Sequence, residues 1–308
     1  MKTGQTLLNT RSDHTSLIYS YLPPHNNSKN FNLNKSLVKL IPSRVRRWVY
    51  KPYLYVKDKY QVYIEKRNPM IPPEWKIFVG GGNFEGIGNR FFHHFKEQGQ
   101  LKPDETVLDV GCGQGRMAIP LTSYLRNGHY EGMDIVNRGI EWCRKKITPK
   151  HKNFNFQVAD IYNKFYNPTG KYKSSEYTFP YPNASFDFIF LTSVFTHMLP
   201  ADVENYLKEI SRVLKPGGRC MITWFIQNEE SQRLAAENQS SMNFQYDFEN
   251  YTTTDASMPE LAVGFNESYI RRLYEKNELD LARPIYFGNW CGRKDTLDFQ
   301  DIILAVKK

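Results

Sequence analysis

The stretch Val107–Arg116, VLDVGCGQGR, places an acid inside an apolar run and follows it with three glycines at alternate positions. Glycine adopts backbone angles that other residues avoid and lets a ligand approach the main chain closely. A dinucleotide-binding G-x-G-x-x-G loop would have its third glycine one position later, where this chain has Arg116. A carboxylate two residues before the first glycine, Asp109, suits a ligand with an ammonium group better than a pyrophosphate. The stretch therefore predicts a binding loop for a ligand of that kind.

Two further acids follow the next two apolar runs. Asp134 ends GHYEGMD and lies 19 residues after Gly115, and Asp160 ends FNFQVAD. In an open α/β sheet, ligands bind beyond the carboxyl ends of the strands, and an acid about 20 residues after the glycine loop contacts a ribose. Either acid alone could simply cap the next helix or turn. Together with Asp109, they place three acids at three consecutive strand ends, which favours a ligand site.

Apolar runs and amphipathic segments alternate from about Trp75 onward, which predicts βαβ units with helices on both faces of a parallel sheet. The last two runs leave no room for a helix between them, so they predict an antiparallel hairpin at one edge. The expected fold is α/β, a Rossmann-like doubly wound seven-stranded sheet that is mostly parallel. Strands are expected at 105–111, 128–136, 154–162, 185–195, 219–226, 284–290 and 298–308, and helices at 115–125 (kinked by Pro120), 138–147, 201–215 and 266–279.

The order of these motifs closely resembles that of class I S-adenosylmethionine-dependent methyltransferases, over roughly residues 76–308. The resemblance rests on VLDVGCGQG, YEGMDIV, QVADIY, FDFIFLTSVFTHM and VLKPGGRCMITW, in that order. It implies S-adenosyl-L-methionine as the cofactor, with Asp134 on the ribose hydroxyls, Asp160 on the adenine amine and Ile161 beside the ring. Asp109 would meet the methionyl end, directly or through ordered water. The expected cofactor contacts are Asp109, Gly111, Cys112, Gly113, Gly115, Asp134, Ile135, Asp160, Ile161 and Thr192.

The implied reaction is a direct displacement at a sulfonium methyl group, in which the protein mainly aligns the acceptor. A hydroxyl acceptor also needs a base, and His197, just past the fourth strand, has a suitable pKa class. The alternative, which we favour slightly, is that His197 hydrogen-bonds the loop before the helix at Ala201. Thr192, Ser193 and Thr196 are weaker candidates for chemistry, and the last two could instead satisfy backbone groups.

Several segments could shape an acceptor pocket. Gly80–Gly82 could form a flexible lip, with the next helix either over the cofactor or in the core. The stretches 163–182 and 227–258 are long, aromatic-rich excursions, which are often functional lids but could equally be packed surface loops. Trp290–Arg293 could be a tight hairpin tip near the acceptor. The reaction needs no thiol, so we expect no chemistry from Cys291.

Charge divides the chain near residue 75. Residues 1–75 carry a net charge of +9, whereas residues 76–308 are neutral. The first 30 or so residues are expected to be disordered. After them, basic residues are interleaved with Trp48 and Tyr50, which suits either an anionic membrane or nucleic acid, or an arm whose aromatics pack on the domain. Because Pro42 and Pro52 interrupt the segment, we favour the packed arm, with little affinity for RNA or anionic vesicles.

Three classes of function remain. The favoured one is methylation of a hydroxyl or amine on a small molecule or glycan, because the domain is charge-neutral and shows no nucleic-acid module. The second is methylation of RNA or protein guided by the basic extension, and the third is a binding protein without catalysis. No signal peptide or membrane span is evident, and we expect a cytoplasmic, reduced protein without a metal site. The wide spacing of the cysteines fits neither a CxxC metal site nor the disulfide framework of a small secreted protein; they are Cys112, Cys143, Cys220 and Cys291.

Overall fold

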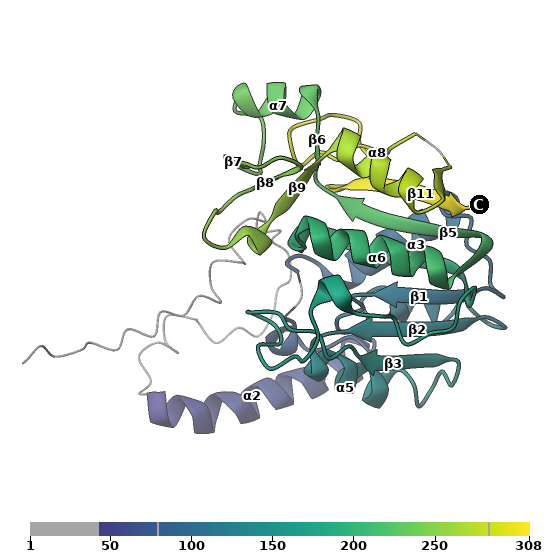
Figure 1. Ribbon diagram of the computed structural model, residues 1–308. Coiled ribbons are helices and arrows are strands. Elements are labelled where there is room, and N and C mark those ends of the chain that lie inside the picture. The colour runs from purple at the N-terminus through teal and green to yellow at the C-terminus, as the bar shows by residue number, and fades with distance from the viewer. Residues whose placement is uncertain (1–42, 79, 283) are drawn as a thin grey trace, which may run out of the picture.

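A seven-stranded sheet forms the centre of the protein (Figure 1). The structure is a computed structural model that describes residues 43–308 apart from 79 and 283, with side chains described from residue 52 onward; the expected disorder of the first 30 residues lies outside this range. The strand order is β10-β11-β5-β4-β1-β2-β3, in which β11 is antiparallel to β5 and β10 and the other neighbours are parallel. This confirms the predicted fold class. The strands are β1 (Thr106–Val110), β2 (His129–Asp134), β3 (Phe154–Val158), β4 (Phe186–Leu191), β5 (Leu214–Trp224), β10 (Leu279–Leu281) and β11 (Asp301–Lys307).

Both faces of the sheet are buried, which explains why its strands read as continuous apolar runs. In β1, Leu108 and Val110 pack into one core cluster, and Val107 packs into the other. The first cluster also takes residues from α6 and α8, and the second takes residues from α3, α4 and α5. The helices are α3 (Phe84–Glu97), α4 (Ala118–Leu121), α5 (Asn137–Lys146), α6 (Pro200–Val213) and α8 (Glu267–Lys276), with short 3-10 helices at η2 (Glu74–Lys76), η3 (Ser174–Glu176), η4 (Phe195–His197) and η5 (Pro259–Leu261).

Two predicted elements differ from the structure. The helix expected at 115–125 is reduced to the four residues of α4, because the glycine-rich turn extends up to its start. The strand expected at 284–290 is absent, and β10 pairs with β11 in its place. Within 284–290, Tyr286 makes only an isolated bridge to Ile302. Proline at 284 lacks an N–H, and the Gly288 N–H donates to the Asp301 carboxylate rather than to a strand.

The second excursion of the sequence, at 227–258, forms much of a small folded unit instead of loops. Residues 226–266, which we name the cap, hold a four-stranded sheet of order β6-β9-β8-β7 and one helix. Their bounds are β6 (Ile226–Gln227), α7 (Glu229–Ala236), β7 (Tyr246–Asp247), β8 (Tyr251–Thr253) and β9 (Val263–Asn266). Figure 1 shows the cap beyond the arrowhead of β5, which is the edge where the parallel strands end.

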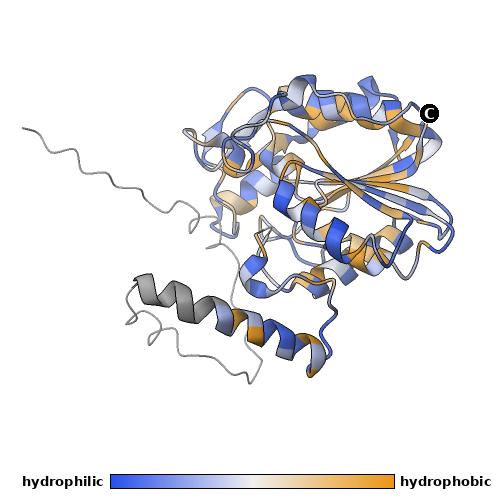
Figure 2. Cartoon of the chain, turned by 90° about the horizontal axis from the view of Figure 1, so that it is seen from below, coloured by the Kyte–Doolittle hydropathy of each residue, from blue (hydrophilic) through white to orange (hydrophobic). Residues whose placement is uncertain are grey.

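The basic segment before the domain forms a single helix, α2 (Ser43–Tyr63), despite Pro52 inside it. Figure 2 shows that α2 runs along the outside of the domain. Several of its large side chains are exposed, among them Tyr55, Val56, Tyr60 and Tyr63. The packed-arm interpretation is therefore wrong for this face of the helix, while the side chains of Trp48 and Tyr50 lie outside the described set. Along the described residues, no helix combines the length and the apolarity needed to cross a bilayer.

Candidate active site

The glycine loop after β1 has the backbone conformation that its sequence predicts. Gly111, Gly113 and Gly115 all have positive φ, at 87°, 55° and 78°. A Cβ atom at Gly111 would lie 2.4 Å from Cγ2 of Val194, in the loop after β4. Glycine at 111 is therefore required by the protein's own packing, whereas the sequence attributed it to the approach of a ligand. A Gly111→Val variant would disturb the loop itself. Any loss of cofactor binding by this variant would therefore not show that a ligand approaches the main chain at Gly111.

Asp134 connects the glycine loop to the start of α5. One carboxylate oxygen accepts a hydrogen bond from Gly113 N at 2.7 Å, and the other accepts one from Val136 N at 2.8 Å. Burial raises the pKa of Asp134, and these backbone hydrogen bonds oppose that shift. The capping role considered from the sequence is present, and in addition the carboxylate fixes the loop beside which it lies.

Asp109 is directed into the protein. Its side chain is fully buried, and its Oδ2 accepts a hydrogen bond of 2.6 Å from the hydroxyl of Tyr130 on β2. Oδ1 has no hydrogen-bond partner among the described residues. Burial raises the pKa of Asp109 to about 8; the Tyr130 hydrogen bond opposes this, and nearby Asp134 adds to it. In this arrangement Asp109 links β1 to β2, and its contact with a ligand, directly or through ordered water, stays a prediction.

A pocket of about 610 Å³ lies past the carboxyl ends of β2 and β3. Two predicted cofactor residues, Ile135 and Asp160, line it, and the Asp160 side chain is 43% exposed with Lys171 Nζ 3.7 Å away. No sequence motif indicated the other lining residues, although the aromatic-rich segment 163–182 supplies three of them. These other residues are Val136, Asn137, Arg138, Val158, Phe165, Tyr166 and Asn167.

The remaining predicted cofactor residues do not line this pocket. Cys112 is 4% exposed and Ile161 is 1% exposed, and both belong to the apolar core. Thr192 is half-buried at the end of β4. Its neighbour Ser193 has a φ of 56°, donates its backbone N–H to Thr223 Oγ1 and donates its hydroxyl to Gln300 Oε1. The Ser193 hydroxyl thus bonds a side chain, and not a backbone group as the alternative interpretation of the sequence proposed.

His197 connects the end of the main sheet to the cap. Its Nδ1 lies 3.0 Å from the backbone oxygen of Glu260, at the 3-10 helix η5 of the cap. A carbonyl only accepts, so Nδ1 carries the proton and Nε2 keeps a lone pair that can accept one. Burial lowers the pKa of His197, which keeps the ring neutral at physiological pH. The partner is therefore the cap and not the loop before α6, and the geometry is compatible with both a structural and a basic role.

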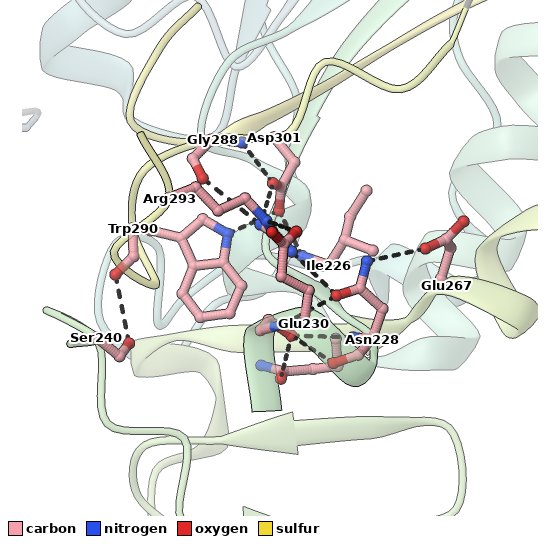
Figure 3. Close-up of polar contacts among 11 residues, drawn as sticks. Ile226, Asn228, Glu230, Ser240, Glu267, Gly288, Trp290, Arg293 and Asp301 are labelled. Atoms are coloured by element: carbon pink, nitrogen blue, oxygen red, sulfur yellow. Dashed lines mark hydrogen bonds and ion pairs between the residues drawn. The ribbon is translucent and has the colours of Figure 1, made fainter. Parts of the chain in front are cut away.

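A buried carboxylate at the start of β11 holds the base of the cap (Figure 3). Asp301 is fully buried, and its Oδ2 accepts hydrogen bonds from Ile226 N at 2.6 Å and from Trp290 Nε1 at 2.8 Å. Its Oδ1 accepts from Gly288 N and lies 3.3 Å from Nη1 of Arg293, which also pairs with Glu230 of α7. Burial raises the pKa of Asp301 to about 6. The 290–293 segment is thus an anchor between the sheet and the cap rather than a free hairpin tip.

Comparison with known proteins shows what the middle of the chain is similar to. Residues 108–222 match the family model for a methyltransferase domain. This part of the chain is therefore similar to a methyltransferase domain. Uncharacterized methyltransferase C1B3.06c of Schizosaccharomyces pombe is 28% identical over 38% of this chain and 39% of the relative. Fatty-acid O-methyltransferase of Mycolicibacterium smegmatis is 27% identical over 44% of this chain and 42% of the relative. The chain thus aligns with only about two fifths of either relative's length.

The fold has a solved counterpart in the PH0226 protein of Pyrococcus horikoshii, at a TM-score of 0.52 and 15% sequence identity. That similarity covers 81% of this chain and 99% of the other, and it shows the fold. Methyltransferase domains of the kind that residues 108–222 resemble use S-adenosylmethionine as their cofactor. The pocket suits its nucleoside, because Ile135 and Val158 offer apolar contacts and Asp160 offers an acceptor at the rim. Asp134 is connected to this pocket through Val136, one of its lining residues, and to the glycine loop through Gly113.

Proposed function

We propose that the chain transfers a methyl group from S-adenosylmethionine to a hydroxyl or amine of a small molecule or glycan. The pocket beyond β2 and β3, with Asp160 at its rim and the glycine loop beside it, is the observation that supports this most strongly. The neutral charge of residues 76–308 supports a small acceptor over nucleic acid. Relatives are named for a fatty acid, demethylmenaquinone and a sterol, all of which are small molecules.

The cofactor residues of the proposal fall into two groups. Asp160 and Ile135 would hold the nucleoside, and Asp134, Gly111, Gly113 and Gly115 would keep the loop in place. When bound, S-adenosylmethionine supplies a methyl group on a positively charged sulfur, so the protein's task is alignment and, for a hydroxyl acceptor, removal of a proton. His197 Nε2 is the proposed proton acceptor. We also propose a cytoplasmic location, which the four free, buried cysteines in the described chain support.

A methyl-transfer experiment distinguishes the proposed acceptor class from the RNA or protein alternative. The full chain is incubated with S-adenosylmethionine labelled in its methyl group and a cell extract, which is then separated into low-mass, RNA and protein fractions. We expect the label in the low-mass fraction, and no transfer in a parallel reaction without the chain. Label confined to RNA or protein would contradict the proposed acceptor and support the alternative.

A further inference from the structure

One face of α2 carries an uncovered apolar stripe. Tyr55, Val56, Tyr60 and Tyr63 are 59%, 64%, 51% and 62% exposed, and Ile64, which directly follows the helix, is 63% exposed. At 100° per residue these positions fall within one half of the helix circumference. Scattered exposed apolar residues are ordinary, but a contiguous group of five large ones marks an interaction surface.

The opposite face of α2 is less exposed than the stripe. Leu54 and Val62 are half-buried on that face. Asp58 there pairs with Arg67, whose backbone N–H also donates to Gln61 O at 2.9 Å. The chain that follows is fixed to α5, because Trp142 Nε1 donates to Met70 O at 2.8 Å. The tyrosine side chains of the stripe thus lie on the more exposed face of the helix, where a partner can reach them.

The stripe lies in a strongly basic setting. Residues 43–67 contain eight basic and two acidic residues, a net charge of +6. Lys59 lies within the stripe, 5.5 Å from the ring centroid of Tyr55 and 5.6 Å from that of Tyr63. Burial, and after it the charge of Lys59, lower the pKa of Lys146 at the end of α5, which indicates that cations crowd this side of the molecule. Lys66 adds another exposed positive charge at the end of the stripe.

We propose that α2 docks the protein on an anionic lipid bilayer, with the stripe at the level of the headgroups. Tyrosine suits that level, because its ring is apolar and its hydroxyl stays in contact with water. Lysine and arginine beside an apolar face add attraction to anionic lipids. The helix lies on the bilayer and does not span it. The inference rests on α2 alone, and vesicle binding by a chain that failed to bind S-adenosylmethionine would leave it intact.

The test is flotation of the full chain with vesicles at about 0.1 M salt, where exposed charges still act over about 10 Å. We expect binding to phosphatidylcholine vesicles that contain about one third phosphatidylglycerol, and at least about tenfold weaker binding to pure phosphatidylcholine. High salt should weaken the binding. Absence of binding to the anionic vesicles, or equal binding to both, would overturn the proposal.

Two pairs of variants assign the binding to α2. Tyr60→Ser/Tyr63→Ser should weaken vesicle binding at least about tenfold, whereas Tyr162→Ser/Tyr246→Ser, at sites 51% and 41% exposed elsewhere, should not. Lys59→Glu/Lys66→Glu should weaken it similarly. The control Lys208→Glu/Lys276→Glu makes the same change in net charge at exposed sites on α6 and α8. An equal loss in test and control variants would overturn the proposal.

Two other outcomes would assign the stripe to another occupant. A dimer in solution that Tyr60→Ser/Tyr63→Ser dissociates, without vesicle binding by the unchanged chain, would assign the stripe to a second copy. Salt-sensitive binding of single-stranded RNA that the same variant loses, again without vesicle binding, would assign it to nucleic acid. Either result would overturn lipid docking. The replaced side chains are exposed, so an unchanged melting temperature is expected and verifies that each variant is folded.

Discussion

If the acceptor is a hydroxyl and His197 is its base, replacing His197 with alanine is expected to lower kcat by about 100-fold or more while leaving the Kd for S-adenosylmethionine unchanged. The reason is that Nδ1 lies 3.0 Å from Glu260 O, which leaves Nε2 as the proposed proton acceptor at the end of β4. Because burial lowers the pKa of His197, the ring loses its proton below its usual value of about 6.5. The wild-type rate should therefore fall only as the pH drops below that value, and measurement of kcat against pH checks this.

Asparagine at 197 separates the basic role from the structural one. Its amide can donate to Glu260 O from nearly the position of Nδ1, but it offers no group that takes up a proton at neutral pH. If His197 is the base, His197→Asn should be as slow as His197→Ala and should lose the acidic limb of the pH profile. Restoration of wild-type kcat by asparagine would show that His197 only holds the cap.

Replacing Asp134 with alanine is expected to weaken S-adenosylmethionine binding by about 100-fold, or about 2.7 kcal/mol. The change removes the acceptor of both Gly113 N and Val136 N, and hydrogen bonds to a charged group are worth about 1.5–3 kcal/mol each. The glycine loop and the start of α5 would then lose their common anchor. Titration calorimetry on the folded variant measures the effect.

Glu131→Ala is the matched control for Asp134, because it removes a carboxylate from the same strand. Glu131 accepts from Asn155 and lies 2.7 Å from His129 Nε2, and it contacts neither the glycine loop nor α5 through a hydrogen bond. Its loss should leave the cofactor Kd within about threefold of wild type, a difference of about 0.7 kcal/mol. A similar result for Asp134→Ala would show that the carboxylate does not organise the site.

Periodicity and motif order were sufficient to predict the sheet, because both of its faces are buried and its strands carry apolar residues throughout. Periodicity and motif order were insufficient where a contact between residues far apart in the sequence determines the local structure. The segment 284–290 has the composition of a strand, but the backbone N–H of Gly288 donates to the buried Asp301 carboxylate, which also accepts from the indole of Trp290. Pro52 argued against a long helix, yet α2 continues through it. Local pattern cannot anticipate either outcome.

In the candidate site, too, the sequence pattern predicted the position of residues along the strands but not their long-range contacts. The spacing of Asp134 and Asp160 after their strands indicated the correct edge of the sheet, since parallel strands end together there. It did not indicate that Asp109 would turn inward to Tyr130, because side-chain direction depends on a neighbour 21 positions away. Nor did it connect His197 with Glu260, which is 63 residues later in the cap. Contacts of this kind are set by tertiary packing.

Titration calorimetry of the full chain with S-adenosylmethionine and, separately, with NADH tests the central claim most directly. The acid–glycine spacing at Asp109–Gly115, the pocket at Asp160 and the methyltransferase domain all predict saturable binding of S-adenosylmethionine. They also predict an increase in melting temperature as its concentration rises, since a ligand that binds only the folded state stabilises it. Binding of NADH without binding of S-adenosylmethionine would contradict the account.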